Sequence, residues 1–331
     1  MKRSWGKLAA FCLGLFLLIW ILTHVGFEET LAQVRQVGWS FSWLLLPSLL
    51  MSVLFTAGWW WIVPPGVPFG HLFLIRTAGE AINVVTPLAY LGGEPLKASL
   101  LRRFGIPLSD ALASVVVSKT TATFAYCLFI FLGLAAAPFR MEEASSALVG
   151  GIGAGLFLAL SLVVLYYGQR RGLFSLLHRL IHRLGARGET WMPKREGVEI
   201  LDGKIATLYR SRQAVVACFV LSLVGWLVTA VEAHLFLWAM GTPVDLMTAL
   251  IIQALFLGVK AATFFVPANL GTQEGGTVLI FLGLGMSAEA AVAFSILRRA
   301  REVLWILAGI AVLARSGWPA LQGRPEVEPG S

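Results

Sequence analysis

Long apolar segments alternate with short polar ones along almost the whole chain. The apolar segments fall near 8–25, 41–63, 72–91, 108–137, 147–167, 214–240, 246–267, 276–286 and 288–314. A helix needs about 20 mostly apolar residues to cross a bilayer, and most of these segments reach that length. The pattern predicts an all-α fold, a polytopic bundle of transmembrane helices. We interpret the first segment, which follows a basic start, as an uncleaved helix.

Composition agrees with a membrane protein. Among 331 residues, 57% are hydrophobic and 13% are charged, whereas soluble domains carry about 25% charged residues. We expect residues 1–315 to form one integral membrane domain and residues 316–331, which contain three prolines, to be a disordered tail. No segment has the composition of a separate soluble domain.

Two apolar segments carry too many polar residues to be simple spans. The segment 72–91 contains Arg76, Glu80 and Asn83, and the segment around 263–286 contains Asn269 and Glu274. We predict a broken or re-entrant helix in each, because irregular backbone at membrane depth persists only where protein buries it or water lines it. A full crossing by 72–91 is the alternative.

These two segments also resemble each other. The residues Pro87–Glu94 and Pro267–Glu274 lie 180 positions apart. At the same offset, Gly105 matches Gly285 and Lys119 matches Arg299. We therefore predict two pseudo-repeats, at about 40–137 and 214–314, and leave open whether they are parallel or inverted. Paired Gly/Pro-interrupted segments in two halves of a membrane protein indicate a transporter's binding site.

Basic residues concentrate in one loop, which predicts the orientation. The loop 168–213 holds ten Lys/Arg and four Asp/Glu, and the whole chain has a net charge of +8. By the positive-inside rule we expect this loop and the N-terminus to be cytoplasmic. Within it, residues 173–184 form an amphipathic basic stretch that suits an anionic lipid surface. No nucleic-acid partner is expected, because no recognition motif accompanies the charge.

Ionisable residues within apolar sequence are the candidate site residues, because each is costly at membrane depth. Guanidinium groups bind phosphate bidentately, so arginines in a cavity would suit a lipid headgroup. The predicted substrate-binding residues are the ionisable residues Arg76, Glu80, Glu94, Lys119, Glu274, Arg298, Arg299 and Arg301, with the polar and helix-breaking residues of the interrupted segments, Asn83, Gly92, Gly93, Asn269 and Gly271.

Structural explanations compete with binding at these positions. Glu94 and Glu274 would equally serve as buried ion pairs that join the two halves. The arginines near 298–301 would equally form an interfacial band on a tilted helix, with Arg298 and Glu302 spaced to pair at i,i+4. Lys97, at a helix end beside Arg102 and Arg103, would equally extend to the membrane surface.

No catalytic chemistry is evident in the sequence. The five histidines and three cysteines show no metal-binding spacing, and no nucleotide-binding loop or nucleophile motif is present. We expect neither enzymatic activity nor a cofactor. An intramembrane transferase would need a donor site as well as Glu94 or Glu274 as a base, and no donor motif is visible.

Two motifs resemble a known family. Residues 92–98 (GGEPLKA) with 101–105 (LRRFG), and residues 267–274 (PANLGTQE) with Arg298 and Arg299, resemble signatures of the lysylphosphatidylglycerol synthase transmembrane domain family of flippase-like proteins. Residues 79–83 (GEAIN) resemble members associated with hopanoid biosynthesis. The resemblance implies a multi-pass protein of the bacterial inner membrane that moves lipid between leaflets. The family's aminoacyl-transferase domain is not expected, because little sequence follows Ala314.

Two functions are therefore expected from the sequence. The leading hypothesis is a lipid translocator of the flippase or scramblase type, whose partner is a polar or anionic membrane lipid. The alternative is a non-transporting membrane partner that docks a lipid-biosynthesis enzyme through the basic loop 168–213.

Overall fold

A computed structural model describes residues 27–85, 92–141, 160, 163–183, 195–263, 266, 269 and 271–316. Several sequence-based predictions lie outside these ranges: the first apolar helix at 8–25, Pro87, Pro267, most of the segment 147–167, and the tail beyond residue 316.

The predicted all-α fold is confirmed, and strands are absent from the described ranges. The short 3-10 helices η1 (Arg102–Phe104) and η2 (Ala137–Phe139) follow α6 and α7. The α-helices are α2 (Phe27–Val37), α3 (Ser40–Leu44), α4 (Leu46–Trp60), α5 (Phe69–Val85), α6 (Gly93–Leu101), α7 (Leu108–Ala136), α9 (Leu173–Arg183), α10 (Arg195–Arg210), α11 (Arg212–Ala239), α12 (Leu246–Ala262), α13 (Thr272–Gly283) and α14 (Ala288–Ser316).

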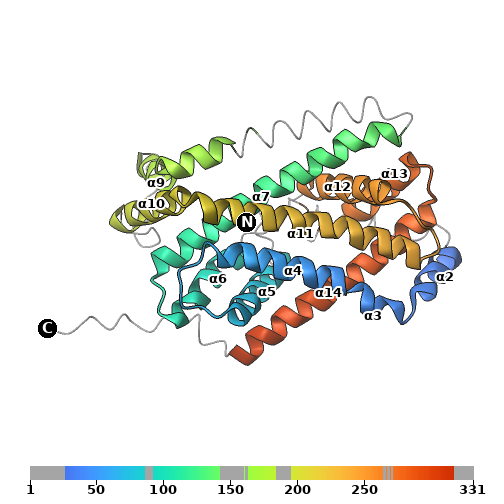
Figure 1. Cartoon of the computed structure of the whole chain (residues 1–331), viewed down its shortest axis with the longest axis horizontal. Coiled ribbons are helices and arrows are strands. Elements are labelled where there is room, and N and C mark those ends of the chain that lie inside the picture. The colour runs from blue at the N-terminus through green and yellow to red at the C-terminus, as the bar shows by residue number, and fades with distance from the viewer. Residues whose placement is uncertain are drawn as a thin grey trace.

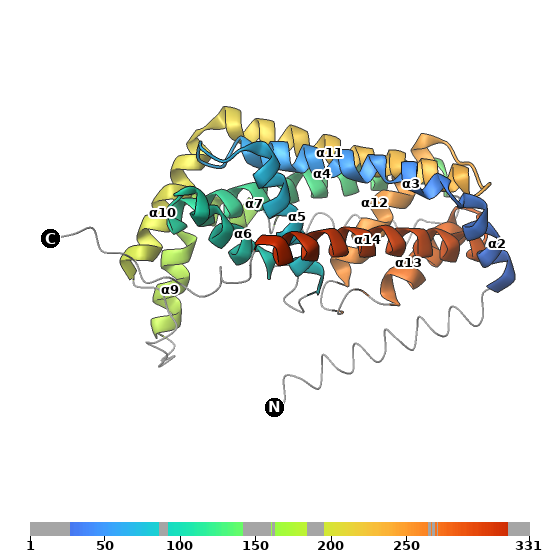
Figure 2. The same ribbon diagram turned by 90° about the horizontal axis from the view of Figure 1, so that it is seen from below.

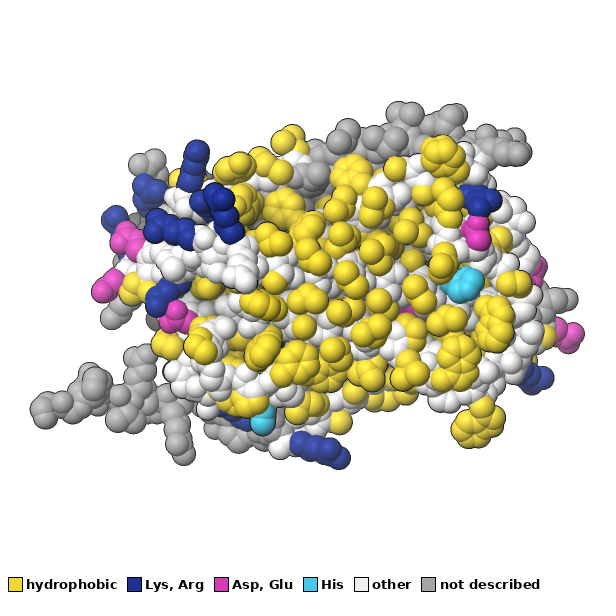
Figure 3. Space-filling view, viewed as in Figure 1, with side chains coloured by type: hydrophobic (Ala, Val, Ile, Leu, Met, Phe, Trp, Pro, Cys, Tyr) yellow, Lys and Arg dark blue, Asp and Glu magenta, His cyan; other side chains and the backbone are white. Residues whose placement is uncertain are grey.

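Three described helical segments are long and apolar enough to cross a membrane: Ser40–Trp60, Leu108–Phe139 and Arg212–Ala239. The helix α14 also has 29 residues, about 43 Å at 1.5 Å per residue, but the five residues 298–302 near its middle include three arginines and a glutamate. Large apolar side chains remain exposed along these helices, and Figure 3 shows them covering the middle of one face. This surface is suited to lipid contact.

The long helices α7 and α14 run in opposite directions along the long axis of the molecule (Figures 1 and 2). The helices α5 and α6 lie toward the end that also carries α9 and α10, whereas α12 and α13 lie toward the opposite end. The packing is reciprocal: α5 packs on α14, α12 packs on α7, and α4 packs on α11. Each long helix therefore contacts the short helix of the other half.

Both predicted helix interruptions coincide with the ends of helices. α5 ends at Val85 and α6, which packs against it, begins at Gly93; α12 ends at Ala262 and α13, which packs against it, begins at Thr272.

The N-terminus of α12 is capped by Asp245, whose Oδ1 accepts the Thr248 N–H at 2.7 Å. Hydrogen bonding from the Thr248 side chain and then its backbone lowers the pKa of this exposed carboxyl.

The described parts of the basic loop, residues 168–183 and 195–213, are largely helical. Residues 163–170 are helical, and α9 and α10 pack against each other, with α10 also packed on α7. Asp202 joins α10 to α9 by accepting hydrogen bonds from the backbone N–H of Phe174 and Ser175, at 3.2 and 2.8 Å. Lysine and arginine side chains cover this end of the molecule in Figure 3. The prediction that residues 173–184 form an amphipathic stretch corresponds to α9.

Glycine is required where α5 and α6 meet. A Cβ added to Gly93 would overlap the carbonyl oxygen of Gly79, and the Gly93 N–H donates to Asn83 Oδ1 at 2.7 Å. We predict that Gly93→Ala lowers the thermal unfolding temperature of the detergent-solubilised protein, since overpacking costs about 1–3 kcal/mol.

The matched control for Gly93→Ala is Gly258→Ala within α12, where an added Cβ meets nothing within 4 Å. We expect this control to leave the unfolding temperature unchanged or raise it, because alanine favours a helix by about 1 kcal/mol over glycine. Equal unfolding temperatures for the two variants would contradict the close approach of α5 and α6.

Candidate functional site

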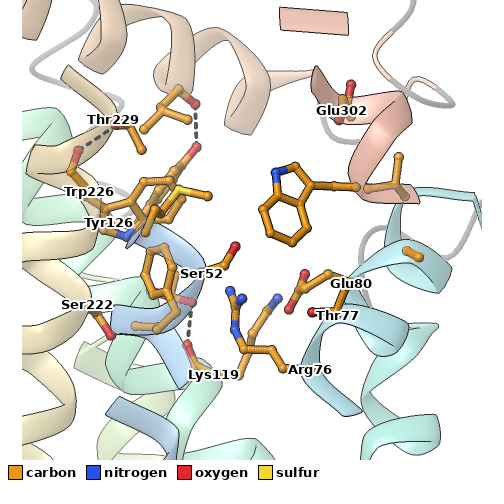
Figure 4. A pocket seen from close by; sticks show the side chains of 18 of the residues that line it. Ser52, Arg76, Thr77, Glu80, Lys119, Tyr126, Ser222, Trp226, Thr229 and Glu302 are labelled. Carbon is orange, nitrogen blue, oxygen red and sulfur yellow. Dashed lines mark hydrogen bonds between the residues drawn. The ribbon is translucent and has the colours of Figure 1, made fainter. Parts of the chain in front are cut away.

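A cavity of about 520 Å³ lies between the two halves of the bundle (Figure 4). Its walls come from α4, α5, α6, α7, α11, α12 and α14, so residues far apart in sequence converge on it. Six cationic and three carboxylate side chains line it: Arg76, Lys97, Lys119, Lys260, Arg298 and Arg301, with Glu80, Glu94 and Glu302. The excess of positive charge suits an anionic ligand.

The first charged cluster is built by α5, α6 and α7. Lys97 Nζ lies 2.6 Å from Glu80 Oε1 and 3.2 Å from Glu94 Oε2, and Lys119 Nζ lies 3.2 Å from Glu94 Oε1. Asn83, which is 1% exposed, donates to Glu94 Oε1 at 3.0 Å. Glu94 is therefore held by two ammonium groups and an amide, which offsets the cost of burying its charge.

Aromatic side chains also line the cavity beside this cluster. The Arg76 guanidinium lies 5.0 Å from the centre of the Phe55 ring, within cation–π distance. Figure 4 shows Arg76, Lys119 and Glu80 gathered at one end, Tyr126 and Trp226 on a second wall, and Glu302 apart from them. Tyr126 is fixed by a 2.5 Å hydrogen bond to the carbonyl of Leu257 in the other half.

The second charged cluster is centred on α14. Arg299 Nε lies 2.8 Å from Glu274 Oε1, and its Nη1 lies 2.8 Å from Glu302 Oε2. Lys260 Nζ lies 3.7 Å from Glu302 Oε1. Glu302 thus pairs with Arg299 and Lys260, and the pair with Arg298 that the i,i+4 spacing allows does not form. Because i,i+3 and i,i+4 partners both lie on one helix face, spacing alone does not choose between them.

The charge of Arg298, unlike that of Arg299 and Arg301, is not neutralised by an ion pair with a described carboxylate. None of the described carboxylates lies within ion-pair distance of it, although it is only 9% exposed. Its guanidinium instead donates to Gln253 and stacks 3.7 Å from the centre of the Phe256 ring. A buried guanidinium without a carboxylate partner attracts an anion from the cavity that it lines.

Arg301 is paired with a carboxylate behind the cavity wall. It donates to Glu232 Oε2, and Glu232 is 2% exposed with its Oε1 lacking a hydrogen-bond partner. Since Glu232 lies on α11 and Arg301 on α14, this pair ties the two helices together. Arg301 also lines the large cavity, whereas Glu232 does not.

The backbone turns before α13 through two left-handed residues. Asn269 has φ +48 and Gly271 has φ +73, and the Asn269 carbonyl accepts from Arg299 Nη2 at 3.3 Å. Asn269 is fully buried, with its Oδ1 accepting from the Thr263 hydroxyl at 2.9 Å. These residues orient Arg299 and do not line the large cavity.

The structure brings most predicted residues together. Arg76, Glu80, Glu94, Lys119, Arg298 and Arg301 line the large cavity. Asn83 holds Glu94, and Gly92 and Gly93 begin α6 beside it. Glu274 and Arg299 line a separate, smaller cavity. Contrary to the structural alternative, the described ion pairs of Glu94 and Glu274 do not join the two halves. Glu94 pairs with Lys97 and Lys119, and Glu274 pairs with Arg299, each within its own half.

Sequence reasoning missed part of the lining. Lys97, expected to extend to the membrane surface, is buried and pairs with two carboxylates. Lys260 and Glu302 carried the same signal as the predicted residues, an ionisable group within apolar sequence. The aromatic walls carried no such signal, because aromatic residues occur throughout the chain. Within the described ranges, no group of three His, Cys, Asp or Glu side chains is placed to hold a metal ion.

We predict that Arg301→Met destabilises the protein by about 3–5 kcal/mol, because it leaves Glu232 buried without its partner. The double variant Arg301→Met/Glu232→Gln should recover most of that loss. Thermal unfolding of the parent protein, the two single variants Arg301→Met and Glu232→Gln, and the double variant in one detergent measures the coupling between the two residues. Additive losses in the double variant would show that the pair contributes nothing to stability.

Comparisons with known proteins agree with this architecture. The chain matches the family described as lysylphosphatidylglycerol synthase TM region over residues 7–310. It is also similar to a UPF0104 membrane protein of Methanothermobacter thermautotrophicus, with 21% identity over 256 residues, covering 74% of each chain. No solved structure matches. Because the match covers nearly the whole chain, this protein belongs to the lysylphosphatidylglycerol synthase transmembrane-region family.

Proposed function

We propose that this protein is a lipid translocator that moves a polar or anionic lipid between the two leaflets of a bilayer. The observation that carries the proposal is the large cavity, in which six cations and three carboxylates meet inside an otherwise apolar bundle. Charged side chains at membrane depth are costly and mark the paths of polar substrates. A fixed structural network would not need an open volume beside it.

The cavity is sized for a headgroup. Its volume of about 520 Å³ lies within the 300–1,000 Å³ of ordinary ligand pockets. In this proposal the headgroup occupies the cavity while the acyl chains remain in the surrounding lipid, along the exposed apolar helices. Arg76 and Arg298, which stack on aromatic rings, bind a phosphate, and Glu80, Glu94 and Glu302 accept donors from the rest of the headgroup.

The placement in the membrane is part of the proposal. Residues 1–315 form one domain in the bacterial inner membrane, with the N-terminus and the basic segment 168–213 in the cytoplasm. The pairs α5/α6 and α12/α13 are re-entrant, each entering from one side and returning to it, as their positions at opposite ends of the long axis favour. A hopanoid-related lipid is one candidate substrate, suggested by residues 79–83.

The alternative is a non-transporting partner of a lipid-biosynthesis enzyme. The observation that favours it is the exposed basic end, where Arg170, Arg171, Arg195 and Arg210 are solvent-exposed. Replacing these four residues with glutamine discriminates the two functions. A docking partner should lose its cellular function, whereas a translocator should retain leaflet exchange and lose mainly attraction to anionic lipid.

We predict that Glu94→Gln slows leaflet exchange of a fluorescent anionic lipid in reconstituted vesicles. The carboxylate organises Lys97, Lys119 and Asn83. A hydrogen bond to a charged group contributes about 1.5–3 kcal/mol, which corresponds to about ten- to a hundredfold in rate.

The matched control is Asp110→Asn, which removes a carboxylate that pairs with Lys204 at 2.9 Å outside the cavity. It should leave the exchange rate unchanged. If Glu94→Gln is folded, reconstitutes normally and exchanges lipid at the rate of the parent protein, the role proposed for the cavity is wrong.

A further inference from the structure

A second, smaller cavity of about 20 Å³ lies beside the large one, in the half formed by α12, α13 and α14. Its lining residues are Phe256, Lys260, Gln273, Glu274, Ser295, Arg298, Arg299, Arg301 and Glu302. Three lining side chains, each less than a tenth exposed, have an atom without a hydrogen-bond partner: Gln273 Nε2, Glu274 Oε2 and Ser295 Oγ. Polar groups buried in this way are prepared for a ligand or for rearrangement.

Most of this lining repeats the first half of the large cavity at a constant sequence distance. Seven of the nine lining residues lie 180 positions after a residue that lines the large cavity. The seven earlier positions are Arg76, Glu80, Glu94, Val115, Ser118, Lys119 and Ala122, and the later ones are Phe256, Lys260, Glu274, Ser295, Arg298, Arg299 and Glu302.

The local structure follows the same register. The helices α7 and α14 both have 29 residues and begin at Leu108 and Ala288. The turns that precede them contain left-handed glycines, with φ +74 at Gly105 and φ +71 at Gly285.

The ion pairs correspond as well. Glu94 pairs with Lys119 in one half, and Glu274 pairs with Arg299 in the other. Since α7 and α14 run in opposite directions, the two sets of residues are related by inversion along the long axis (Figures 1 and 2).

We propose that the small cavity is the closed form of a second headgroup site. It opens as the wall of the large cavity that is formed by α5, α6 and α7 closes. This proposal rests on the lipid-translocator function and deepens it. Two charged clusters at corresponding positions, which share the pairs Glu94–Lys119 and Glu274–Arg299, would present a headgroup to opposite sides of the bilayer in turn. In secondary transporters, inverted units commonly alternate in this way around a site near the midplane.

The chemistry of the small cavity indicates the class of headgroup. Arg298 and Arg299 supply guanidinium donors for a phosphate, and the Gln273 amide and the Ser295 hydroxyl add neutral donors. Glu274 Oε2, an acceptor, requires a donor from the ligand. The ligand is therefore a phosphate-bearing headgroup that also carries a hydroxyl or amine, such as a glycerol or amino-alcohol headgroup.

Four residues line both cavities: Lys260, Arg298, Arg301 and Glu302. Arg298 differs from Arg301 in that no ion pair with a described carboxylate holds it. The Arg298 guanidinium stacks on Phe256 and lies 5.5 Å from the Phe294 ring, so these rings hold it, and none of the described carboxylates does. Opening of the small cavity requires Arg299 to leave Glu274 or Glu302, to which it is bonded at 2.8 Å. A phosphate offers Arg299 a replacement anion.

Cysteine accessibility tests this proposal. In a Cys12→Ser/Cys218→Ala background, buried Cys127 serves as an internal unreactive control. Single variants Ser118→Cys and Ser295→Cys report on the large and small cavities. Each is placed in bilayer discs of phosphatidylcholine, with or without phosphatidylglycerol. Its reaction with a small charged methanethiosulfonate is then followed by mass spectrometry.

In phosphatidylcholine we expect Ser118→Cys to react and Ser295→Cys to react about tenfold more slowly or less, since the closed state dominates. Phosphatidylglycerol should accelerate Ser295→Cys and slow Ser118→Cys. If Ser295→Cys does not fold, Gln273→Cys reports on the same cavity.

The outcomes separate this inference from the proposed function. If phosphatidylglycerol protects Ser118→Cys while the small-cavity cysteine stays as unreactive as Cys127, the large cavity binds a headgroup and the second site is wrong. If neither cysteine responds to phosphatidylglycerol, both the second site and headgroup binding in the large cavity are wrong.

Discussion

Compensation of charge inside the apolar bundle is the constraint on which the rest of the structure depends. Glu94 and Glu274 are largely buried, and each is held by a cation that lies 25 positions later on the long helix of its own half. A helix that carries one of these charges would not be stable in lipid without the helix that carries the opposite charge, because an unpaired buried charge is far more costly than a pair. The pairs therefore determine how α6 sits on α7 and α13 on α14.

The backbone around these pairs follows from the same constraint. The carboxylates reach membrane depth at the start of short helices, and the chain must turn sharply before each one. Gly93 lets α6 approach the carbonyl of Gly79, and the left-handed residues Asn269 and Gly271 turn the chain before α13. Asn83 and Asn269 satisfy polar atoms of these turns. The charged clusters, the turns and the cavity are thus one arrangement, with the aromatic rings as its apolar boundary.

The sequence predicted the features that follow from the free-energy cost of placing individual residues in the membrane. Apolar length predicted the helices, and polar residues within apolar sequence predicted the interruptions before Glu94 and Glu274, together with most of the charged lining. Partner choice was not predictable, as Arg298 and Glu302 show, because it depends on how each helix is rotated about its axis. The burial of Lys97 depends on how α6 packs against α5, and the wall that contains Tyr126 depends on a contact with Leu257, 131 residues later in the chain. Sequence periodicity contains neither kind of information. The pseudo-repeats stay a prediction, now supported by the shared register of the two cavities.

The most direct test of the central claim, that the charged cavity binds a lipid headgroup, is mass spectrometry of lipids retained by the gently purified protein. The comparison is between the parent protein and Arg298→Ala, with Asp110→Asn as the control outside the cavity. The account predicts one enriched phosphate-bearing lipid class in the parent and in Asp110→Asn, and its loss in Arg298→Ala, because Arg298 is the buried cation without a carboxylate partner among the described residues. Retention of bulk membrane lipid alone, unchanged by Arg298→Ala, would contradict it.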